Sequence, residues 1–315
     1  MVRKKKKNIL VIFPESIGGR LTTNSLIEGY KQNGCNVTVF DELFDTNLDE
    51  VLQGSYDYIS GYDFSGLRIK VNNNLDLPSI NYFSDDIRSN TSGKDWEKYL
   101  PYLEEDDNYT FYWDRQLTEY ENFKHIYYLP HFVDFNIYKD LGTEPEFDIM
   151  FAGRLDSDYR LSFFEELVMR MPTLKVAWYA IDRHYRDARS RAQYPDILVL
   201  CYMGFIDNEE DMVKAINNSK IVFNMHSQGI SSLNYRTFQT AACKRLMISD
   251  YRDELALFEG YMPFYEDMTD LIFKIENYID DKDAYNTITE NCYRIAKKNH
   301  NSEDCVRYIL KQMCK

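Results

Sequence analysis

The sequence has few cysteines for its length, and they form no recognisable group. Six cysteines are scattered over 315 residues, without a Cys-x-x-Cys pair and without a zinc-ligand spacing to histidine. This distribution excludes a secreted disulfide framework and indicates reduced, mostly buried thiols. We therefore expect a cytoplasmic protein.

Long hydrophobic runs are also missing. No stretch approaches the roughly 18 apolar residues that a membrane-spanning helix needs. The first apolar run, residues 9–13, is shorter than the ~7–15 residues of a signal-peptide core, and Pro14 and Glu15 end it. The sequence thus predicts a soluble protein without a secretion signal.

Basic residues are scarce relative to acidic ones. The chain has 37 Lys and Arg against 51 Asp and Glu, a net charge of −14. Binding to nucleic acid relies on clustered cations, so nucleic acid is not an expected partner. The exception is the run Arg-Lys-Lys-Lys-Lys at residues 3–7. Two interpretations are open for it: a solvated tail, or a peripheral contact with a membrane surface.

What is present is an alternation of short apolar runs with helical patterns, which is typical of parallel βαβ units. The pattern restarts after a polar connection at residues 139–146, and the end of the chain is helical from residue 267. We predict an α/β fold of two Rossmann-like domains, residues 1–140 and 141–315, with a helical C-terminal tail. One large doubly wound sheet is the alternative. Predicted strands lie at 8–13, 37–40, 56–60, 78–83, 109–113, 126–129, 147–153, 174–179, 197–200, 221–224 and 246–249.

In such folds ligands lie at the carboxyl ends of the strands, with phosphates at helix N-termini. The first strand-to-helix turn carries Gly18 and Gly19, which would let the backbone approach a ligand closely. It lacks the Gly-x-Gly-x-x-Gly spacing of a dinucleotide site, so a bound NAD is not expected. A simple tight turn is the alternative.

The turn that opens the second domain carries Gly153, Arg154 and Arg160. Arginine can grip a diphosphate with two parallel hydrogen bonds. Arginine at a helix start also opposes the helix dipole, which favours a ligand-binding role over ordinary surface charge. We therefore assign these residues to a diphosphate-binding turn.

The richest segment is residues 224–250, where a strand is followed by a polar loop and a helix. Ser231 and Ser232 can cap that helix, and Gly229 lies in the loop before them. We expect their N–H groups to be open to an anionic ligand. Arg236 and Gln239 share one helix face and suit a phosphate and a ribose hydroxyl. His226 is a further candidate for contact with the donor.

The motif Arg236-Thr-Phe-Gln239, followed by a small-residue run and the strand 246–250, resembles the C-terminal signature of GT-B glycosyltransferases, particularly the CgeB-like spore-maturation group. The stretch from Leu129 to Asp134 resembles the family's entry into the second domain. The resemblance implies two Rossmann-like domains facing across a cleft. It also implies an N-terminal domain for the acceptor and a C-terminal domain for a nucleotide-sugar donor.

Two positions depart from the family pattern. Many related enzymes have a pair of glutamates where this chain has Ser231 and Gln239, and the later glutamate binds ribose. Glutamine can still hydrogen-bond a hydroxyl, but a neutral amide is a weaker acceptor than a carboxylate. The departure bears on catalysis and on its stereochemical outcome.

Candidates for a catalytic base lie at strand ends of the first domain. Asp85 and Asp86 follow one strand and Asp114 follows another. His131 is a further catalytic candidate, which like His226 could contact the donor sugar or phosphate. Turn or N-cap roles are the alternative for the aspartates. No Asp-x-Asp motif follows a strand, so we expect no metal site and no cofactor.

These inferences predict transfer of a sugar from a nucleoside-diphosphate sugar, with a UDP-sugar as the expected donor, to a hydroxyl of a glycan or protein acceptor without a metal ion. Fixed guanidinium charge and backbone dipoles would stabilise the leaving diphosphate. Two alternatives stay open on the same fold. One is a non-catalytic scaffold that binds a glycan or protein in a surface or spore-coat assembly, and the other is a sugar-nucleotide epimerase.

Overall fold

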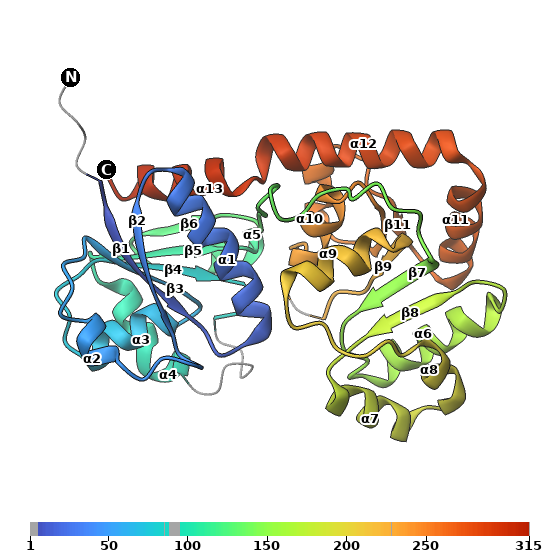
Figure 1. Ribbon diagram of the computed structural model, residues 1–315, viewed down its shortest axis with the longest axis horizontal. Helices are drawn as coiled ribbons and strands as arrows, with labels where there is room; N and C mark the ends of the chain where they lie inside the picture. The colour runs from blue at the N-terminus through green and yellow to red at the C-terminus, as the bar shows by residue number, and fades with distance from the viewer. Residues whose placement is uncertain (1–5, 85, 88–94, 228, 315) are drawn as a thin grey trace. The chain divides into compact units, whose positions relative to one another are not determined.

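The computed structural model (Figure 1) describes residues 6–84, 86–87, 95–227 and 229–314. The chain forms two compact units. Unit 1 comprises residues 1–134, 228–235 and 299–315, and unit 2 comprises residues 135–227 and 236–298. The chain therefore returns to unit 1 twice after residue 140. The predicted division at 140/141 does not contain these two returns.

Unit 1 contains a parallel sheet of six strands in the order β2-β1-β3-β4-β5-β6. The strands are β1 (Asn8–Phe13), β2 (Asn36–Asp41), β3 (Tyr58–Tyr62), β4 (Ser79–Phe83), β5 (Asn108–Tyr112) and β6 (Ile126–Tyr128). The helices between them are α1 (Ile17–Gln32), α2 (Leu48–Val51), α3 (Ser65–Asn72), α4 (Asp95–Tyr99) and α5 (Arg115–Tyr120), with a 3-10 turn at Leu100–Glu104.

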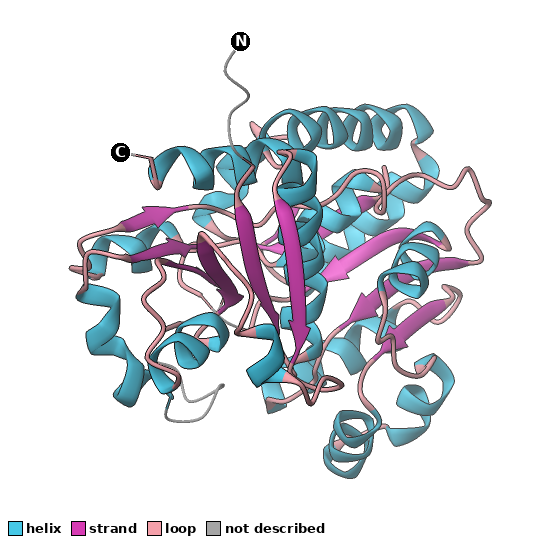
Figure 2. Ribbon diagram, turned by 60° about the vertical axis from the view of Figure 1, so that its left-hand side comes forward, coloured by secondary structure: helices cyan, strands magenta, loops and turns pink. Residues whose placement is uncertain are grey.

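The near-continuous apolar run of β1 reflects burial on both faces of this sheet. Ile9 and Val11 pack into one core, whereas Leu10 and Ile12 pack into a second core on the opposite face. This alternation follows the two-residue repeat of a strand. Helices accordingly lie on both sides of the strands (Figure 2).

The C-terminal helix α13 (Ser302–Gln312) packs in unit 1, where it lies beside α1 (Figure 1). Val306 and Ile309 on α13 are fully buried in the core of unit 1. Gly29 allows the close approach, because a Cβ atom there would overlap the Val306 side chain and lie 2.6 Å from the Ser302 carbonyl oxygen.

Unit 2 contains a parallel sheet of five strands in the order β11-β10-β9-β7-β8. The strands are β7 (Phe147–Ala152), β8 (Val176–Tyr179), β9 (Ser219–Asn224), β10 (Leu246–Asp250) and β11 (Phe264–Tyr265). The helices are α6 (Asp158–Arg170), α7 (Asp182–Arg191), α8 (Pro195–Cys201), α9 (Glu209–Asn217), α10 (Tyr235–Ala242), α11 (Met268–Asp280) and α12 (Lys282–Asn299), with a 3-10 turn at Asp253–Phe258.

These two parallel sheets and the helical C-terminal region confirm the predicted α/β class. One predicted strand is wrong: residues 197–200 belong to helix α8. A four-residue apolar run fits either a strand or one side of a buried helix. Pro195 at the first helical position favours the helix, because its fixed φ suits a helix start.

Candidate functional site

A cavity of about 450 Å³ lies at the carboxyl ends of β7, β9 and β10 in unit 2. This is the edge at which open α/β sheets bind ligands. The nine lining residues come from the turn after β7, the first turn of α6, the turn after β9, the end of β10, and β11: Asp156, Ser157, Tyr159, Arg160, Met225, His226, Ser227, Asp250 and Tyr265.

Arg160 is the buried cation of this cavity. Its Nε donates to the Arg154 carbonyl at 2.9 Å and its Nη1 donates to the Met225 carbonyl at 3.0 Å. The carboxylate of Asp156 is 3.5 Å away. Burial lowers the pKa of Arg160, and the charges of Asp156 and Asp250 oppose that shift. The guanidinium thus joins the β7 turn to the end of β9, in a position to meet an anionic ligand.

Arg160 lies in the first turn of helix α6. Its N-cap is Ser157, whose hydroxyl accepts the Arg160 N–H at 3.2 Å. Arg154 lies in the turn before this helix, partly exposed, and pairs with Asp156 at 3.3 Å. The predicted grouping of Gly153, Arg154 and Arg160 around a helix start is therefore present, although only Arg160 lines the cavity.

His226 and Asp250 also line the cavity and contact each other. One oxygen of Asp250 accepts the His226 backbone N–H at 3.0 Å and lies 2.6 Å from Nδ1 of the same residue. Burial raises the pKa of Asp250, but these bonds and the charge of Arg252 outweigh it and lower the pKa below its usual value. The carboxylate favours the tautomer of His226 with its hydrogen on Nδ1. Asp250 was not among the residues predicted from sequence, although its place at the end of a predicted strand was the available signal.

Residues 229–232 do not present open N–H groups as the sequence led us to expect. The carboxylate of Asp114 accepts the N–H groups of Ile230, Ser231 and Ser232 at 2.8, 2.9 and 3.1 Å, and the Ser231 hydroxyl at 3.0 Å. Gly229 has a φ of +75°, and a Cβ there would overlap the Ser232 hydroxyl. Because glycine tolerates this backbone conformation and has no Cβ, the loop can close over Asp114. An internal carboxylate occupies the position predicted for an external anion.

Asp114 follows β5 and also caps helix α5, where it accepts the Leu117 N–H at 3.0 Å. Burial raises its pKa, but the N–H groups of Leu117, Ile230 and Ser231 and the Ser231 hydroxyl lower it more, so the carboxyl is ionised below its usual range. Asp114 therefore has the N-cap role that was the alternative to a catalytic base.

Arg236 and Gln239 lie on α10 and contact each other. Oε1 of the buried Gln239 accepts from Arg236 at 2.6 Å, and its Nε2 donates to the Tyr138 hydroxyl at 2.6 Å. Neither residue lines the cavity at the strand ends. Their predicted contacts with phosphate and ribose stay predictions.

The remaining candidates belong to unit 1. His131 is buried among aromatic rings, with Nδ1 3.1 Å from the Tyr82 hydroxyl, and burial lowers its pKa to about 3. Asp86 is half-buried, and Asp85 lies outside the described residues. Gly18 is in the first turn of α1, and a Cβ at Gly19 would lie 2.7 Å from the Tyr62 ring, so close helix packing accounts for that glycine.

Within the described part of the chain, no group of three His, Cys, Asp or Glu side chains is placed to hold a metal ion. In the same residues, no helix has the length and apolar content to cross a bilayer.

The two parallel sheets have the GT-B fold of glycosyltransferases, as comparison with solved structures shows. Residues 160–311 match the protein-family model described as glycosyl transferase-like. This range begins at Arg160 and contains His226 and Asp250. No curated protein matches the sequence.

Three solved structures illustrate the likeness. A sucrose-phosphate synthase from Thermosynechococcus elongatus matches with a TM-score of 0.73 and 12% identity, over 97% of this chain and 98% of that one. An alpha-glucosyltransferase in complex with UDP and DNA matches with a TM-score of 0.74 and 12% identity, over 99% and 100%. Anabaena HepE in complex with UDP and glucose matches with a TM-score of 0.70 and 14% identity, over 98% and 99%.

Proposed function

We propose that the chain transfers a sugar from a nucleoside-diphosphate sugar, with UDP as the nucleotide, to an acceptor hydroxyl. The observation that carries this proposal is the cavity of unit 2, which combines a buried guanidinium with a carboxylate-histidine pair at the carboxyl edge of a parallel sheet. The choice of UDP is supported by its presence with Anabaena HepE and with the alpha-glucosyltransferase.

Each wall of the cavity suits one part of such a donor. Arg160 and the first turn of α6 suit the diphosphate, since guanidinium and helix N–H groups stabilise phosphate charge. Asp250 suits hydroxyl groups of ribose or sugar, because a carboxylate accepts two hydrogen bonds strongly. Charge that builds on the leaving diphosphate would be stabilised by a guanidinium already held in place, which costs no reorganisation during the reaction. Transfer without a metal ion is part of the proposal.

The acceptor belongs to the proposal as well. We assign it to unit 1, near Asp86 and the start of α1, and expect a hydroxyl of a glycan or protein. The alpha-glucosyltransferase is complexed with DNA, whereas the net charge of −14 in this chain does not favour a nucleic-acid acceptor. Membership of the CgeB-like group, suggested by the Arg236 to Gln239 motif, is also proposed.

Calorimetric titration with UDP, GDP and dTDP tests the donor site. We expect UDP to bind, and Arg160→Ala to weaken its Kd about ten- to hundredfold, the value of one or two hydrogen bonds to a charged group. Arg170→Ala is the matched control on the same helix, because Arg170 pairs with Glu166 at 3.1 Å outside the cavity. Absence of binding for all three nucleotides refutes the proposal.

A non-catalytic scaffold is the second candidate. It is favoured by the hydrogen bonds that the loop at residues 230–232 already makes within the protein. The N–H groups predicted to hold the diphosphate are bonded to Asp114, and the amide of Gln239 is bonded to two protein side chains. This candidate predicts that UDP binds while no sugar leaves a UDP-sugar, with or without acceptors. Release of UDP from a UDP-sugar in the presence of an acceptor excludes it. Conversion of the free donor to another sugar without acceptor would instead indicate an epimerase.

A further inference from the structure

Helix α7 is unusually basic for this chain. It contains four arginines and two aspartates over Asp182–Arg191, whereas the whole protein carries a net charge of −14. Arg186 pairs with Asp182, and Arg191 pairs with Asp187 and Asp158. Arg183 and Arg189 form no ion pair with a carboxylate of the described residues. Both side chains are exposed, and Arg183 donates only its Nε to the neighbouring His184 ring at 3.3 Å among the bonds of the described residues, so two guanidinium groups of this helix can meet an external anion.

The inner side of α7 is fixed to unit 2, so its outer side is a defined surface. Ala188 is fully buried, and the ring of Tyr185 stacks on that of Tyr202 with centroids 4.0 Å apart. Tyr185 also contacts Trp178 of β8. Glu165 accepts the N–H groups of Gln193 and Tyr194, which fixes the turn from α7 to α8.

Helix α8 and the loop after it expose large apolar side chains beside this basic helix. Leu200 is 82% exposed, Val199 45% and Met203 47%. Their neighbours Leu198 and Cys201 point inward and are buried. A leucine that is this exposed contributes little hydrophobic stabilisation to the fold. Several such residues together mark an interaction surface.

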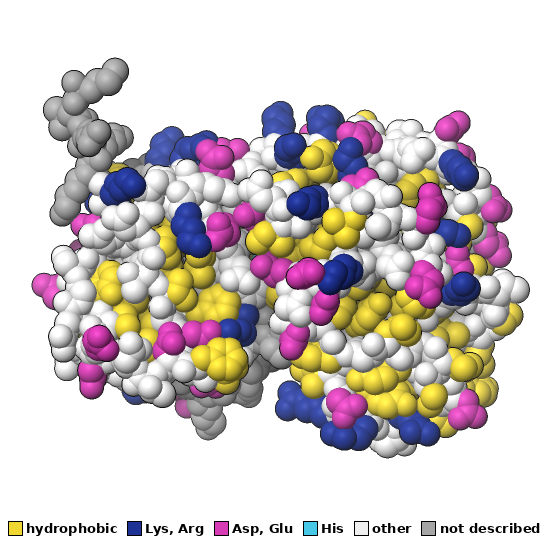
Figure 3. Space-filling view, in the orientation of Figure 1, with side chains coloured by type: hydrophobic (Ala, Val, Ile, Leu, Met, Phe, Trp, Pro, Cys, Tyr) yellow, Lys and Arg dark blue, Asp and Glu magenta, His cyan; other side chains and the backbone are white. Residues whose placement is uncertain are grey.

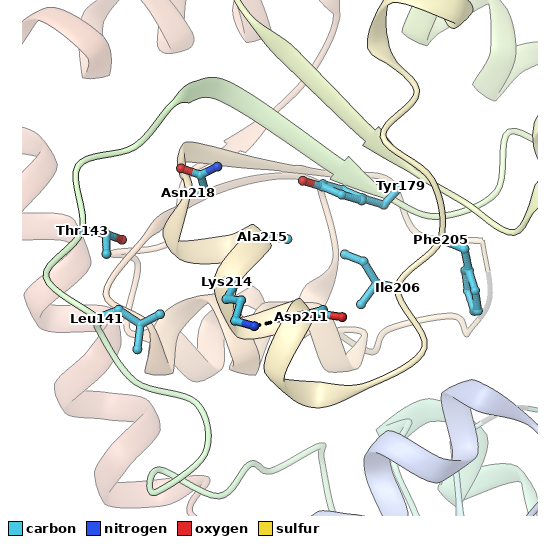
Figure 4. A pocket seen from close by; sticks show the side chains of 9 residues that line it. All are labelled: Leu141, Thr143, Tyr179, Phe205, Ile206, Asp211, Lys214, Ala215 and Asn218. Carbon is cyan, nitrogen blue, oxygen red and sulfur yellow. Dashed lines mark hydrogen bonds and ion pairs between the residues drawn. The ribbon is translucent and has the colours of Figure 1, made fainter.

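The apolar surface continues along the face of unit 2. Figure 3 shows hydrophobic side chains gathered over this face, with Lys and Arg side chains at its lower edge, where Figure 1 places α7. Beyond Met203, Phe205 and Ile206 form one side of a hollow of about 400 Å³, and Leu141 lies across it (Figure 4). Val199 and Leu200 of α8 are exposed and do not line this hollow.

We propose that the surface formed by Arg183, Arg189, Val199, Leu200 and Met203 docks on an anionic lipid surface. Apolar side chains that project next to cations can enter the headgroup region while the guanidinium groups meet lipid phosphates. The charge complementarity is local, because the rest of this acidic chain would be repelled. Phosphates of nucleic acid would attract the arginines but leave Val199, Leu200 and Met203 in water. The proposal is independent of the donor site.

Vesicle flotation of the full chain tests this. We expect the protein to float with phosphatidylcholine vesicles that contain about one third phosphatidylglycerol, and not with pure phosphatidylcholine, and to be released by high salt. Arg183→Glu and Arg189→Glu should each lower the bound fraction about fivefold or more, the effect of one cation near an anionic membrane. Leu200→Asp should lower it at least as much. Phe273→Asp on α11 and Arg170→Glu on α6 are the matched controls, since both residues are exposed outside this surface.

Several results would overturn the proposal. The first is failure to float with anionic vesicles. The second is binding that survives all three substitutions but is lost when Lys4 to Lys7 are changed to glutamine, which would assign the contact to the basic N-terminus. The third is self-association that Leu200→Asp abolishes without vesicles, because the surface would then join two copies. Thermal unfolding of each variant checks that the fold is retained, which the exposure of these side chains leads us to expect.

Discussion

The carboxylate of Asp114 accepts both the backbone N–H of Ser231 at 2.9 Å and its hydroxyl at 3.0 Å. The two residues are 117 positions apart in the sequence, yet the cluster resembles an anion held at a helix start. Here the anion is part of the protein. The segment that leaves β9 of unit 2 is thereby held in unit 1 before it enters α10.

The first prediction concerns this cluster. Asp114→Asn should lower the free energy of unfolding of unit 1 by about 2–3 kcal/mol, because an amide presents its own N–H groups to buried donors that then lose their charged acceptor. Urea denaturation measures the change. Asp106→Asn is the control: that carboxylate is exposed and pairs with Lys124, so we expect its replacement to change the stability little.

The same hydrogen bonds should make the free energy of unfolding depend on pH in the acid range. The pKa of Asp114 is lowered in the folded state, so its contribution is fully present above the ordinary carboxyl pKa and is lost as pH falls through the lower folded value. The difference in stability between the wild type and Asp114→Asn should therefore shrink below about pH 4. A difference that stays constant down to pH 2 would show that the ionised carboxylate is not what holds the loop.

The second prediction concerns His131. Burial lowers its pKa from 6.5 to about 3, so between these values the unfolded chain binds a proton that the folded chain does not. Stability should fall as pH falls below about 6.5, by roughly 2 kcal/mol at pH 5 from this residue. In His131→Phe the slope of stability against pH over this range, measured by urea denaturation at several pH values, should be smaller than in the wild type.

The third prediction tests the packing of α13 on α1. Gly29→Ala should destabilise unit 1 by about 1–3 kcal/mol, because the new methyl group overlaps Val306 and the Ser302 carbonyl. The usual gain of about 1 kcal/mol for alanine over glycine in a helix acts against this loss. Thermal unfolding measures the net effect. Lys31→Ala on the exposed side of the same helix should change stability little, and a stabilising Gly29→Ala would refute the close approach.

The fourth prediction concerns Gln239. Gln239→Leu should cost about 1–3 kcal/mol, because it leaves the buried Tyr138 hydroxyl and the Arg236 guanidinium without their shared partner. Chemical denaturation of the variant tests this. Titration of the same folded variant with UDP tests the ribose contact expected from sequence. A UDP affinity equal to that of the wild type would remove Gln239 from the donor site.

Local pattern predicted most of the fold. Two parallel sheets were predicted from the apolar run of β1, the glycine turn at Gly153 and the restart near residue 147. This was possible because strand and helix periodicities depend on residues that are close together in the sequence. The short run at 197–200 was predicted incorrectly, since four apolar residues carry too little periodicity to separate a strand from a helix. Arg160 was identified from its place after a strand, and the structure puts it in the cavity.

The sequence by itself determined the fold class and the strand ends where chemistry is possible. Only the tertiary structure decided how the polar groups pair: Asp250 with His226, Asp114 with the loop at 230–232, and Gln239 with Tyr138. It also decided that α13 completes the core of unit 1. The physical reason is that hydrogen bonds and packing depend on distance in space, and residues far apart in sequence carry no local sign of their partners.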